Sequence, residues 1–300
     1  MIDFFAKAMG EIKETKLSEI PEMPKFFEDL PEGQTDKDSP VATVNPIGYA
    51  EDDLHSNPLT LTEASEYAKA NNTLTLSEVT YKTDDNGNIY CIDGKLQPNT
   101  TYELNGNVYT TDANGRIVSC EAWPVRTPEN PRDLEAQRQA GGDYRRPNDQ
   151  GGHIVGRDMS GDGGFGNLVA MDSNINQSDY KRMENNIKTA LDEGKDVATK
   201  TELTYSGDSE RPDRITVTVS AEGEDTVYKF DNNLDGALGN EVPASGKETV
   251  LSRLDETGGD ISSIKEEYNK AGSLDETTVY ITYKGEDGTN YRTSVVIESQ

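Results

Sequence analysis

Tight-turn dipeptides divide the middle of this chain into short stretches of β-forming residues. Asn105-Gly106 and Asn114-Gly115 are the clearest, since Asn-Gly favours the left-handed backbone that a two-residue hairpin turn requires. The stretches beside such turns are rich in Val, Ile, Thr and Tyr, and they cover residues 75–82, 89–93, 100–104, 107–111 and 116–120. The pattern predicts antiparallel strands, with a hairpin closed by Asn105-Gly106.

One long helix and further strands are predicted in the second half of the chain. Ser173 or Asn174 can cap a helix that continues to about Glu193, where Gly194 ends it. Strands are expected at 197–205, 214–221, 226–230, 277–284 and 291–297, and a weak helix at 263–270. The fold class that follows is α+β, with a C-terminal β-hairpin extension.

Three regions are expected along the chain. Residues 1–60 hold a short charged helix and then a flexible, acidic linker. Residues 61–235 begin with a short helix at 62–71 and contain the first strands and the long helix, with a loop at 122–152 that is rich in Pro and Gly. Residues 236–300 form an extension whose role the sequence does not indicate.

The chain is strongly acidic, with a formal net charge of −27, and only 32% of its residues are apolar. Such a charge argues against a nucleic-acid partner, because phosphate binding depends on basic side chains. The charge is uneven, however: residues 141–200 carry 8 basic and 10 acidic side chains, whereas residues 201–300 carry 9 and 21. A local basic patch in the first window can still hold a phosphate, while the long-range field slows its approach. The alternative is that the acidity reflects only solubility or habitat.

The sequence gives few indications of cellular location. No apolar run approaches the ~20 residues that a membrane-spanning helix needs. Residues 1–20 alternate charges with short apolar pairs, unlike a Sec signal peptide, so export would use a non-classical route. Cys91 and Cys120 both fall in expected strands, which leaves a disulfide and two buried thiols equally open.

An ordered set of polar residues gives the clearest functional indication. His153 ends the run Asp-Gln-Gly-Gly-His, and Asn176 and Glu184 follow it within a window of 32 residues. Imidazole can take a proton from water near neutral pH, an amide oxygen suits Mg²⁺, and a carboxylate can hold one of the ion's waters. On an α-helix Asn176 and Glu184 would lie about 80° apart, so both can border one cleft. A metal-assisted phosphodiesterase needs these three groups; the alternative for a histidine alone is a buried structural role.

The glycines around His153 predict local irregularity. The pair Gly151-Gly152 predicts a turn that leads into a strand after His153. The stretch 156–166 is expected to be a flexible loop between the strand pair and the helix. Its acidic residues fit the first positions of an EF-hand loop, but Val169 stands where that loop requires glutamate, which excludes a calcium site of this type.

From about Pro98 to Asn232 the chain resembles the DNA/RNA non-specific endonucleases of the ββα-metal type. The residues that carry the resemblance are Asp149 to Ile154, Asn167-Leu168-Val169, Ile175-Asn176-Gln177 and Lys181 to Glu184. The branch that it resembles holds streptococcal-type nucleases and nuclease toxins of type VII secretion, with an EssD-like domain. Residues 61–235 would then be the endonuclease domain, with a ββα-metal core on an antiparallel sheet.

The resemblance implies roles for these residues. His153 would act as general base toward water, Asn176 would bind Mg²⁺, or Mn²⁺ in its place, and Glu184 would hold the water shell of the ion. Cleavage would leave 5′-phosphate ends on DNA and RNA. Asn174 competes with Asn176 for the metal role, but a helix cap is the favoured assignment for Asn174.

The chain departs from the common pattern of this family at one position. Many members have Asp-Arg-Gly-His, whereas Gly151 stands here where the arginine would fall, as it does in the EssD-like branch. The arginine that meets the phosphate is therefore open. Arg145, Arg146 and Arg157 are the nearest in sequence, and Arg157 and Arg146 are the preferred candidates.

Two classes of function follow from the sequence. The first is a metal-dependent, sugar-non-specific endonuclease, used as a secreted toxin or a scavenger and accompanied in the toxin case by an immunity protein. The second is a binding module that keeps the nuclease fold without turnover, which the acidity and the extra tail would suit. The presence of all three polar residues favours the nuclease.

Overall fold

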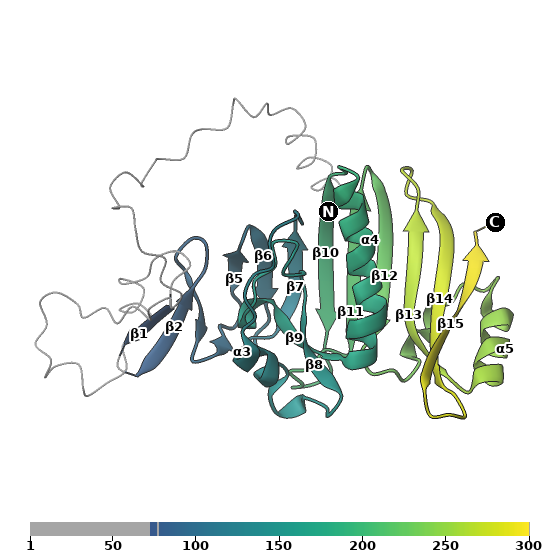
Figure 1. The fold of residues 1–300 in the computed structure, drawn as a ribbon, viewed down its shortest axis with the longest axis horizontal. Coiled ribbons are helices and arrows are strands. Elements are labelled where there is room, and N and C mark those ends of the chain that lie inside the picture. The colour runs from purple at the N-terminus through teal and green to yellow at the C-terminus, as the bar shows by residue number, and fades with distance from the viewer. Residues whose placement is uncertain (1–72, 77, 300) are drawn as a thin grey trace, which may run out of the picture. The chain divides into compact units, whose positions relative to one another are not determined.

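Antiparallel strands make up most of the structure, a computed structural model that describes residues 73–76 and 78–299 (Figure 1). They form one sheet of nine strands, one of four and one of two. With a few helices on this framework, the structure confirms the α+β class. The strands are β1 (Thr73–Leu76), β2 (Val79–Thr83), β3 (Ile89–Ile92), β4 (Lys95–Leu96), β5 (Thr101–Leu104), β6 (Asn107–Thr111), β7 (Ile117–Ala122), β8 (Asp149–His153), β9 (Leu168–Asp172), β10 (Val197–Thr204), β11 (Arg214–Ala221), β12 (Glu224–Asp231), β13 (Asp260–Tyr268), β14 (Leu274–Lys284) and β15 (Asn290–Glu298).

The order of strands in the large sheet follows the chain closely. It runs β15-β14-β13-β12-β11-β10-β7-β6-β5, whereas β1 to β4 form the four-stranded sheet and β8 pairs only with β9. The predicted C-terminal hairpin is present as β14 and β15. It continues the large sheet, because β13 pairs with β12 along Asp225 to Phe230.

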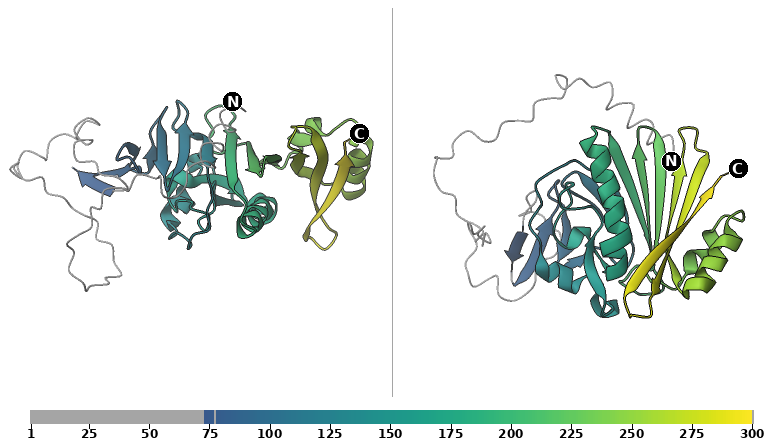
Figure 2. Two further views of the ribbon diagram at one scale, coloured as in Figure 1. Left: turned by 90° about the horizontal axis from the view of Figure 1, so that it is seen from above. Right: turned by 45° about the vertical axis from the view of Figure 1, so that its right-hand side comes forward.

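The helices are short and few. Figures 1 and 2 show α4 and the β8–β9 hairpin on the same face of the nine-stranded sheet. The helices are α3 (Leu134–Gln139), α4 (Lys181–Asp192) and α5 (Lys247–Thr257), with 3₁₀ turns η3 (Gly142–Tyr144), η4 (Phe165–Asn167) and η6 (Ala237–Glu241) and a π-helical segment η5 (Ile175–Tyr180).

The main core lies between the large sheet and the elements on that face. Met183 and Ile187 of α4 are buried against Val217 and Val219 of β11, and the hairpin contributes Met171. Met183 and Ile187 give α4 its buried face, and α4 forms the second part of the helix predicted to continue to about Glu193. A second core packs α5 residues against β13 to β15.

The turn residues behave as the sequence predicts. Asn105 and Gly106 both have positive φ, 54° and 76°, as a two-residue hairpin turn requires. The flanking Leu104 and Asn107 are the last pair of the β5–β6 ladder. Cys91 of β3 and Cys120 of β7 lie in strands and are buried free thiols.

Some predictions of local structure are wrong. No helix forms at residues 263–270: residues 263–268 belong to β13 and residues 269–270 to the turn after it. Ile261 and Ile264 are buried in the second core, and this cross-strand packing overrides the helix propensity of the Lys-Glu-Glu run. The predicted strand at 75–82 is two strands, β1 and β2, separated at Glu78, whose φ is 68°. The predicted loop at 122–152 contains α3, capped by the Asp133 carboxylate, and most of β8.

The expected charged helix and acidic linker of residues 1–60 and the helix at 62–71 lie outside the described residues. Among the residues that are described, no helix is long and apolar enough to cross a membrane.

Candidate active site

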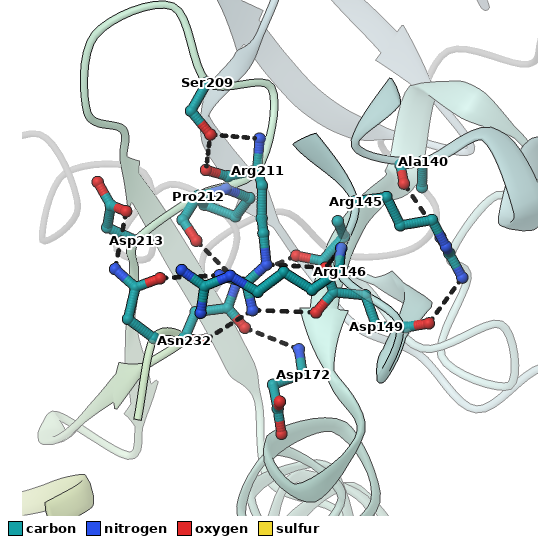
Figure 3. A network of polar contacts seen from close by, with 12 residues as sticks. Ala140, Arg145, Arg146, Asp149, Asp172, Ser209, Arg211, Pro212, Asp213 and Asn232 are labelled. Atoms are coloured by element: carbon teal, nitrogen blue, oxygen red, sulfur yellow. Dashed lines mark hydrogen bonds and ion pairs between the residues drawn. The ribbon is translucent and has the colours of Figure 1, made fainter. Parts of the chain in front are cut away.

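A buried ion pair holds the hairpin that carries His153. The Asp149 carboxylate at the start of β8 receives two bonds from the Arg211 guanidinium, at 2.8 and 3.0 Å. The two side chains are 0% and 3% exposed (Figure 3). The Arg146 backbone N–H also donates to this carboxylate, at 2.7 Å. A two-point pair in a dry site fixes orientation as well as distance, so β8 is held against the chain just before β11.

Asn232 holds the other strand of the same hairpin. Its amide nitrogen donates to the carbonyls of Ala170 and Pro212, and its oxygen accepts from the Asp172 backbone N–H at 2.8 Å (Figure 3). All hydrogen-bonding directions of the amide except one lone pair are used. The end of β9, where the helix begins, is therefore tied to the end of β12.

Gly151 and Gly152 allow the hairpin to pack closely. A Cβ on Gly151 would lie 2.6 Å from the Gln137 Cα in α3, and one on Gly152 would lie 2.9 Å from the Met171 side chain. Backbone packing explains this glycine pair, and the predicted turn into a strand is wrong: His153 ends strand β8, paired with Leu168. The 156–166 stretch likewise connects β8 to β9 within the hairpin, and not the hairpin to the helix.

His153 faces a polar cleft from the end of β8. Its Nε2 is buried and has no hydrogen-bond partner among the described residues. Burial lowers the pKa of His153 to about 4, the positive charges of Arg157 and Arg132 act in the same direction, and a hydrogen bond to the Gly163 backbone opposes them. The ring is therefore neutral at pH 7, with Nε2 available to accept a proton.

Asn176 reaches the cleft from the π-helical segment η5. Its amide nitrogen donates at 2.7 Å to Oε1 of Gln150, which is a residue of β8. With its nitrogen so engaged, the oxygen of the amide is the end left for a ligand. The bond also connects the strand that carries His153 to the helix.

Glu184 lies in the first turn of α4 and borders the same cleft. Burial raises the pKa of this carboxyl to about 7, while Lys188 opposes the shift and Asp158 adds to it. The sequence predicted uninterrupted α-helix from Asn176 to Glu184; the π segment between them breaks that geometry, so the angle expected for an α-helix does not apply.

His153, Asn176 and Glu184 line one cleft of about 650 Å³. Six basic and three acidic side chains border it, on a protein of net charge −27. The cleft therefore has a local excess of positive charge, and several of its basic residues come from the 141–200 window in which a basic patch was expected. The basic members are Arg132, Arg138, Arg145, Arg157, Lys181 and Lys188, and the acidic members are Glu129, Asp158 and Glu184.

Most of these basic groups already have partners. Arg145 donates to three backbone carbonyls, those of Gln137, Ala140 and Asp149, and so stabilises the loop before β8. Arg157 pairs with Glu129 at 2.8 Å, and Lys188 pairs with Asp158 at 2.9 Å.

Arg132 and Lys181 are different. Both line the cleft, and neither side chain has a hydrogen bond or ion pair within the described residues. Arg146, a preferred candidate from sequence, is not among the residues that line the cleft, whereas Arg157 is. Sequence proximity to the histidine thus selected one arginine inside the cleft and one outside it.

Asn174 stands at the start of the helix but does not cap it. Its side chain makes no capping bond, and its oxygen accepts instead from Asn290 Nδ2 at 3.2 Å. Asp172, two residues earlier, accepts the Asn174 backbone N–H at 2.9 Å. The prediction that Asn174 caps the helix is therefore wrong. The side chain that accepts a backbone N–H at the start of the helix is that of Asp172.

Part of this chain is similar in sequence to known proteins. Residues 98–223 match the family model of the DNA/RNA non-specific endonucleases. This segment is similar to that endonuclease family. The type VII secretion system protein EssD of Staphylococcus aureus strain USA300 is 33% identical over 145 residues, which cover 46% of this chain and 24% of that protein. The EssD protein of strain NCTC 8325 matches to the same extent, so the chain spans about a quarter of the length of these curated relatives.

The endonuclease segment offers few protein ligands for a metal ion. No three His, Cys, Asp or Glu side chains gather in a metal-binding group within 73–76 and 78–299. Asn176, whose amide oxygen is the unengaged end, and Glu184, a half-buried carboxylate, are the oxygen donors beside His153. Such a set fits an ion that takes few protein ligands and keeps most of its water, as Mg²⁺ does.

Several residues that build the endonuclease site were not singled out from the sequence. Gln150 was seen only as a neighbour of Gly151, and Arg132 and Arg211 lie 21 residues before and 58 after His153. Asn167, taken only as a family residue, is 0% exposed and is fully bonded, to Tyr109, Asp162 and both backbone groups of Val155. Such residues are identified only by the hydrogen bonds and ion pairs that they make in the folded structure.

Proposed function

We propose that this protein is a metal-dependent, sugar-non-specific endonuclease that hydrolyses phosphodiester bonds of DNA and RNA and leaves 5′-phosphate ends. The observation that carries the proposal is the convergence of His153, Asn176 and Glu184, from a strand end, a π segment and a helix, on one cleft with a basic lining. The endonuclease family of residues 98–223 supports the same reaction class.

The residues divide the work as follows. His153 is neutral, so its Nε2 accepts a proton from the attacking water, which is directed at the phosphorus in line with the departing 3′-oxygen. Asn176 and Glu184 would hold Mg²⁺ or Mn²⁺, the first directly and the second through water, and the ion would supply positive charge at the phosphate. Arg132 and Lys181 bind the flanking phosphates, because their charges are not committed to a partner within the described residues. Arg157 lies deeper and adds positive charge beside the histidine.

The lining of the cleft supports a broad substrate range. No Phe, Tyr or Trp is among the described residues that line this cleft, so no row of such rings is present to stack on bases. Arginine and lysine contacts to phosphate carry no sequence information. Cleavage of both DNA and RNA with little sequence preference is the expected result.

The decisive experiment compares degradation of a plasmid and of a structureless RNA with Mg²⁺, with Mn²⁺ and with a chelator. Wild type should degrade both nucleic acids and should stop in the chelator. An inactive binding module would instead retard both without shortening them. His153→Ala, purified in parallel, controls for a contaminating nuclease.

The metal roles are separated by three variants. Asn176→Ala should abolish Mn²⁺ binding at the site, whereas Glu184→Ala should weaken it about 10–100-fold, as loss of a residue that acts through a bound water does. Asn174→Ala should leave Mn²⁺ binding within a few-fold, since its oxygen bonds Asn290. If Asn174→Ala removes the metal and Asn176→Ala retains it, the assigned register on the helix is off by two residues.

The biological setting is also proposed. The relatives are named type VII secretion system proteins, which supports export of this protein by a non-classical route as a toxin, together with an immunity protein that blocks the cleft in the producing cell. Expression of residues 61–300 inside a bacterial cell should prevent growth, and His153→Ala should restore it. Equal growth of the two strains would contradict a toxin role.

A further inference from the structure

A buried carboxylate in the π segment is held by strands that lie outside the endonuclease match. Asp179, three residues after Asn176, has a side chain that is 2% exposed. Its Oδ2 accepts from the hydroxyls of Ser262 and Ser263, at 2.9 and 2.7 Å. Its Oδ1 forms ion pairs with Arg292 at 2.6 Å and with Arg182 of α4 at 3.5 Å.

Strand β14 completes this cluster. The Arg292 guanidinium lies 3.8 Å from the centre of the Tyr280 ring, and the Arg182 guanidinium lies 5.0 Å from it. Arg292 is thus fixed by a carboxylate and a ring together. Each of the strands β13, β14 and β15 contributes at least one side chain to the group around Asp179.

A second contact lies on the other side of Asn176. The amide nitrogen of Asn290, at the start of β15, donates to the Asn174 side-chain oxygen at 3.2 Å. The C-terminal strands therefore contact the helix at Asn174 and Asp179, which bracket Asn176 in sequence.

The chemistry of these contacts suits positioning more than stability. Burying a carboxylate and an arginine costs desolvation free energy that apolar residues of similar size would not cost. The C-terminal strands already possess an apolar core of their own, built around Ile261, Ile264 and Val279. A π segment also has a less common hydrogen-bond pattern than the α-helix, and such segments persist where surrounding contacts impose them.

We propose that strands β13 to β15 are a working part of the endonuclease, in which Asp179 and Arg292 are positioning residues that keep the π segment in the register presenting Asn176 to the cleft. The inference rests on the proposed metal role of Asn176. It assigns a function to the C-terminal extension, which lies beyond the residues matched by the family model.

The test measures Mn²⁺ binding directly, by electron paramagnetic resonance of the free ion, on the full chain. Arg292→Met keeps the length of the side chain and removes the charge; it should raise the Kd for Mn²⁺ about 10–100-fold. Arg292→Lys should recover most of the affinity, because the ammonium can still meet Oδ1. The matched control is Arg253→Met on α5, which removes an arginine from an exposed ion pair with Glu256 and should leave the Kd unchanged.

Thermal unfolding of the same samples separates positioning from stability. A variant that melts earlier and yet binds Mn²⁺ within twofold of wild type overturns the proposal. If Arg292→Met does not fold, Ser263→Ala removes one donor to Asp179 and should still weaken Mn²⁺ binding several-fold; an unchanged Kd overturns the proposal again.

The outcomes for function and for this inference are independent. A wild-type protein that binds Mn²⁺ but cleaves neither DNA nor RNA removes the proposed function and leaves the positioning test intact. A wild-type protein that cleaves, with Mn²⁺ affinity that is insensitive to Arg292 and Ser263, removes only the inference.

Discussion

Two carboxylate–arginine pairs hold the two segments that bring His153 and Asn176 to the same cleft. Asp149 and Arg211 fix the strand that ends at His153, and Asp179 and Arg292 fix the segment that presents Asn176. In the first pair both residues lie within the endonuclease match at 98–223, and two parallel bonds join them. In the second pair the arginine comes from β15, is 21% exposed, and contacts one oxygen of its carboxylate.

The two pairs differ in how firmly they hold their segments of the chain. The pair on the base side is sealed from water, so losing one member leaves an uncompensated buried charge. On the metal side the carboxylate keeps two serine donors and Arg182 if Arg292 is lost. The strand that ends at His153 is thus held by a residue within 98–223, whereas the segment that carries Asn176 is also held by strands that follow residue 223.

The largest expected effect comes from removing the group that the first pair positions. His153→Ala should reduce nuclease activity about 10²–10⁴-fold, the usual cost of losing a general base. The fold should be retained, because the ring would lose only its hydrogen bond with the Gly163 backbone, and Nε2 has no partner among the described residues. Initial rates on plasmid DNA, together with a far-ultraviolet circular dichroism spectrum, check both statements. Activity within a few-fold of wild type would remove His153 from the chemistry.

Breaking each pair in turn tests the comparison directly. Arg211→Met should lower the free energy of unfolding by about 3–5 kcal/mol, as loss of one partner in a buried pair does. Arg292→Met should cost about 1–3 kcal/mol, since Asp179 keeps its other donors. Urea unfolding of the two variants gives both values. Equal losses would mean that the two sides of the cleft are held alike.

The pH dependence of metal binding should distinguish Glu184 from His153. Glu184, with its pKa raised to about 7, must be ionised to hold the water shell of the ion, so the Kd for Mn²⁺ should rise about tenfold for each pH unit below 7 and level off above it. His153, with its pKa lowered to about 4, stays neutral from pH 5 to 8 and contributes nothing to this slope. Glu184→Gln should flatten the profile, and a slope that survives in that variant would locate the titrating group elsewhere.

For stability the sign of the Glu184 effect is opposite. The folded-state pKa lies above the ordinary carboxyl value of 4.5, so ionisation of Glu184 costs stability. That cost grows as pH rises from about 4.5 to about 7. Metal ion should offset it, because the ion favours the ionised carboxylate.

The smallest expected effect distinguishes two arginines near the cleft. Arg132→Ala should weaken substrate binding about tenfold and reduce the dependence of KM on salt concentration, because one phosphate contact is lost. Arg146→Ala should change KM less than twofold, since Arg146 does not line the cleft. KM measured at two salt concentrations for each variant decides between them. The reverse ranking would restore the choice made from sequence alone.

Local patterns determined much of the fold. Asn105-Gly106 fixed a hairpin because both residues take positive φ at low cost. The helix predicted from Ser173 or Asn174 to about Glu193 is present in its second part as α4. The strand at Asp260–Tyr268 was missed because its Lys and Glu residues favour helix, and only the burial of Ile261 and Ile264 against neighbouring strands outweighs that preference.

The site was predictable only in part, for a related reason. His153, Asn176 and Glu184 follow from residue type and spacing, and the structure brings all three to one cleft. The residues that hold them in place could not be predicted in this way. Gln150, Arg211 and Arg292 act through contacts between segments that are 26, 62 and 113 residues apart. The π segment was also invisible, since nothing in its composition distinguishes it from an α-helical turn.

The contrast between a basic cleft and an acidic protein has a consequence for product release. At about 0.1 M salt the Debye length is ~10 Å, so only the phosphate within the cleft senses the lining, and the rest of a polyanion is repelled weakly or not at all. At ~0.01 M salt the Debye length is ~30 Å, and the acidic remainder of the molecule then acts on the whole strand. A 5′-phosphate end, if it is the product, would carry more negative charge than the diester that it replaces, so at low salt the acidic remainder of the molecule would favour its departure. The protein would then release the nucleic acid after each cleavage, so turnover would be distributive.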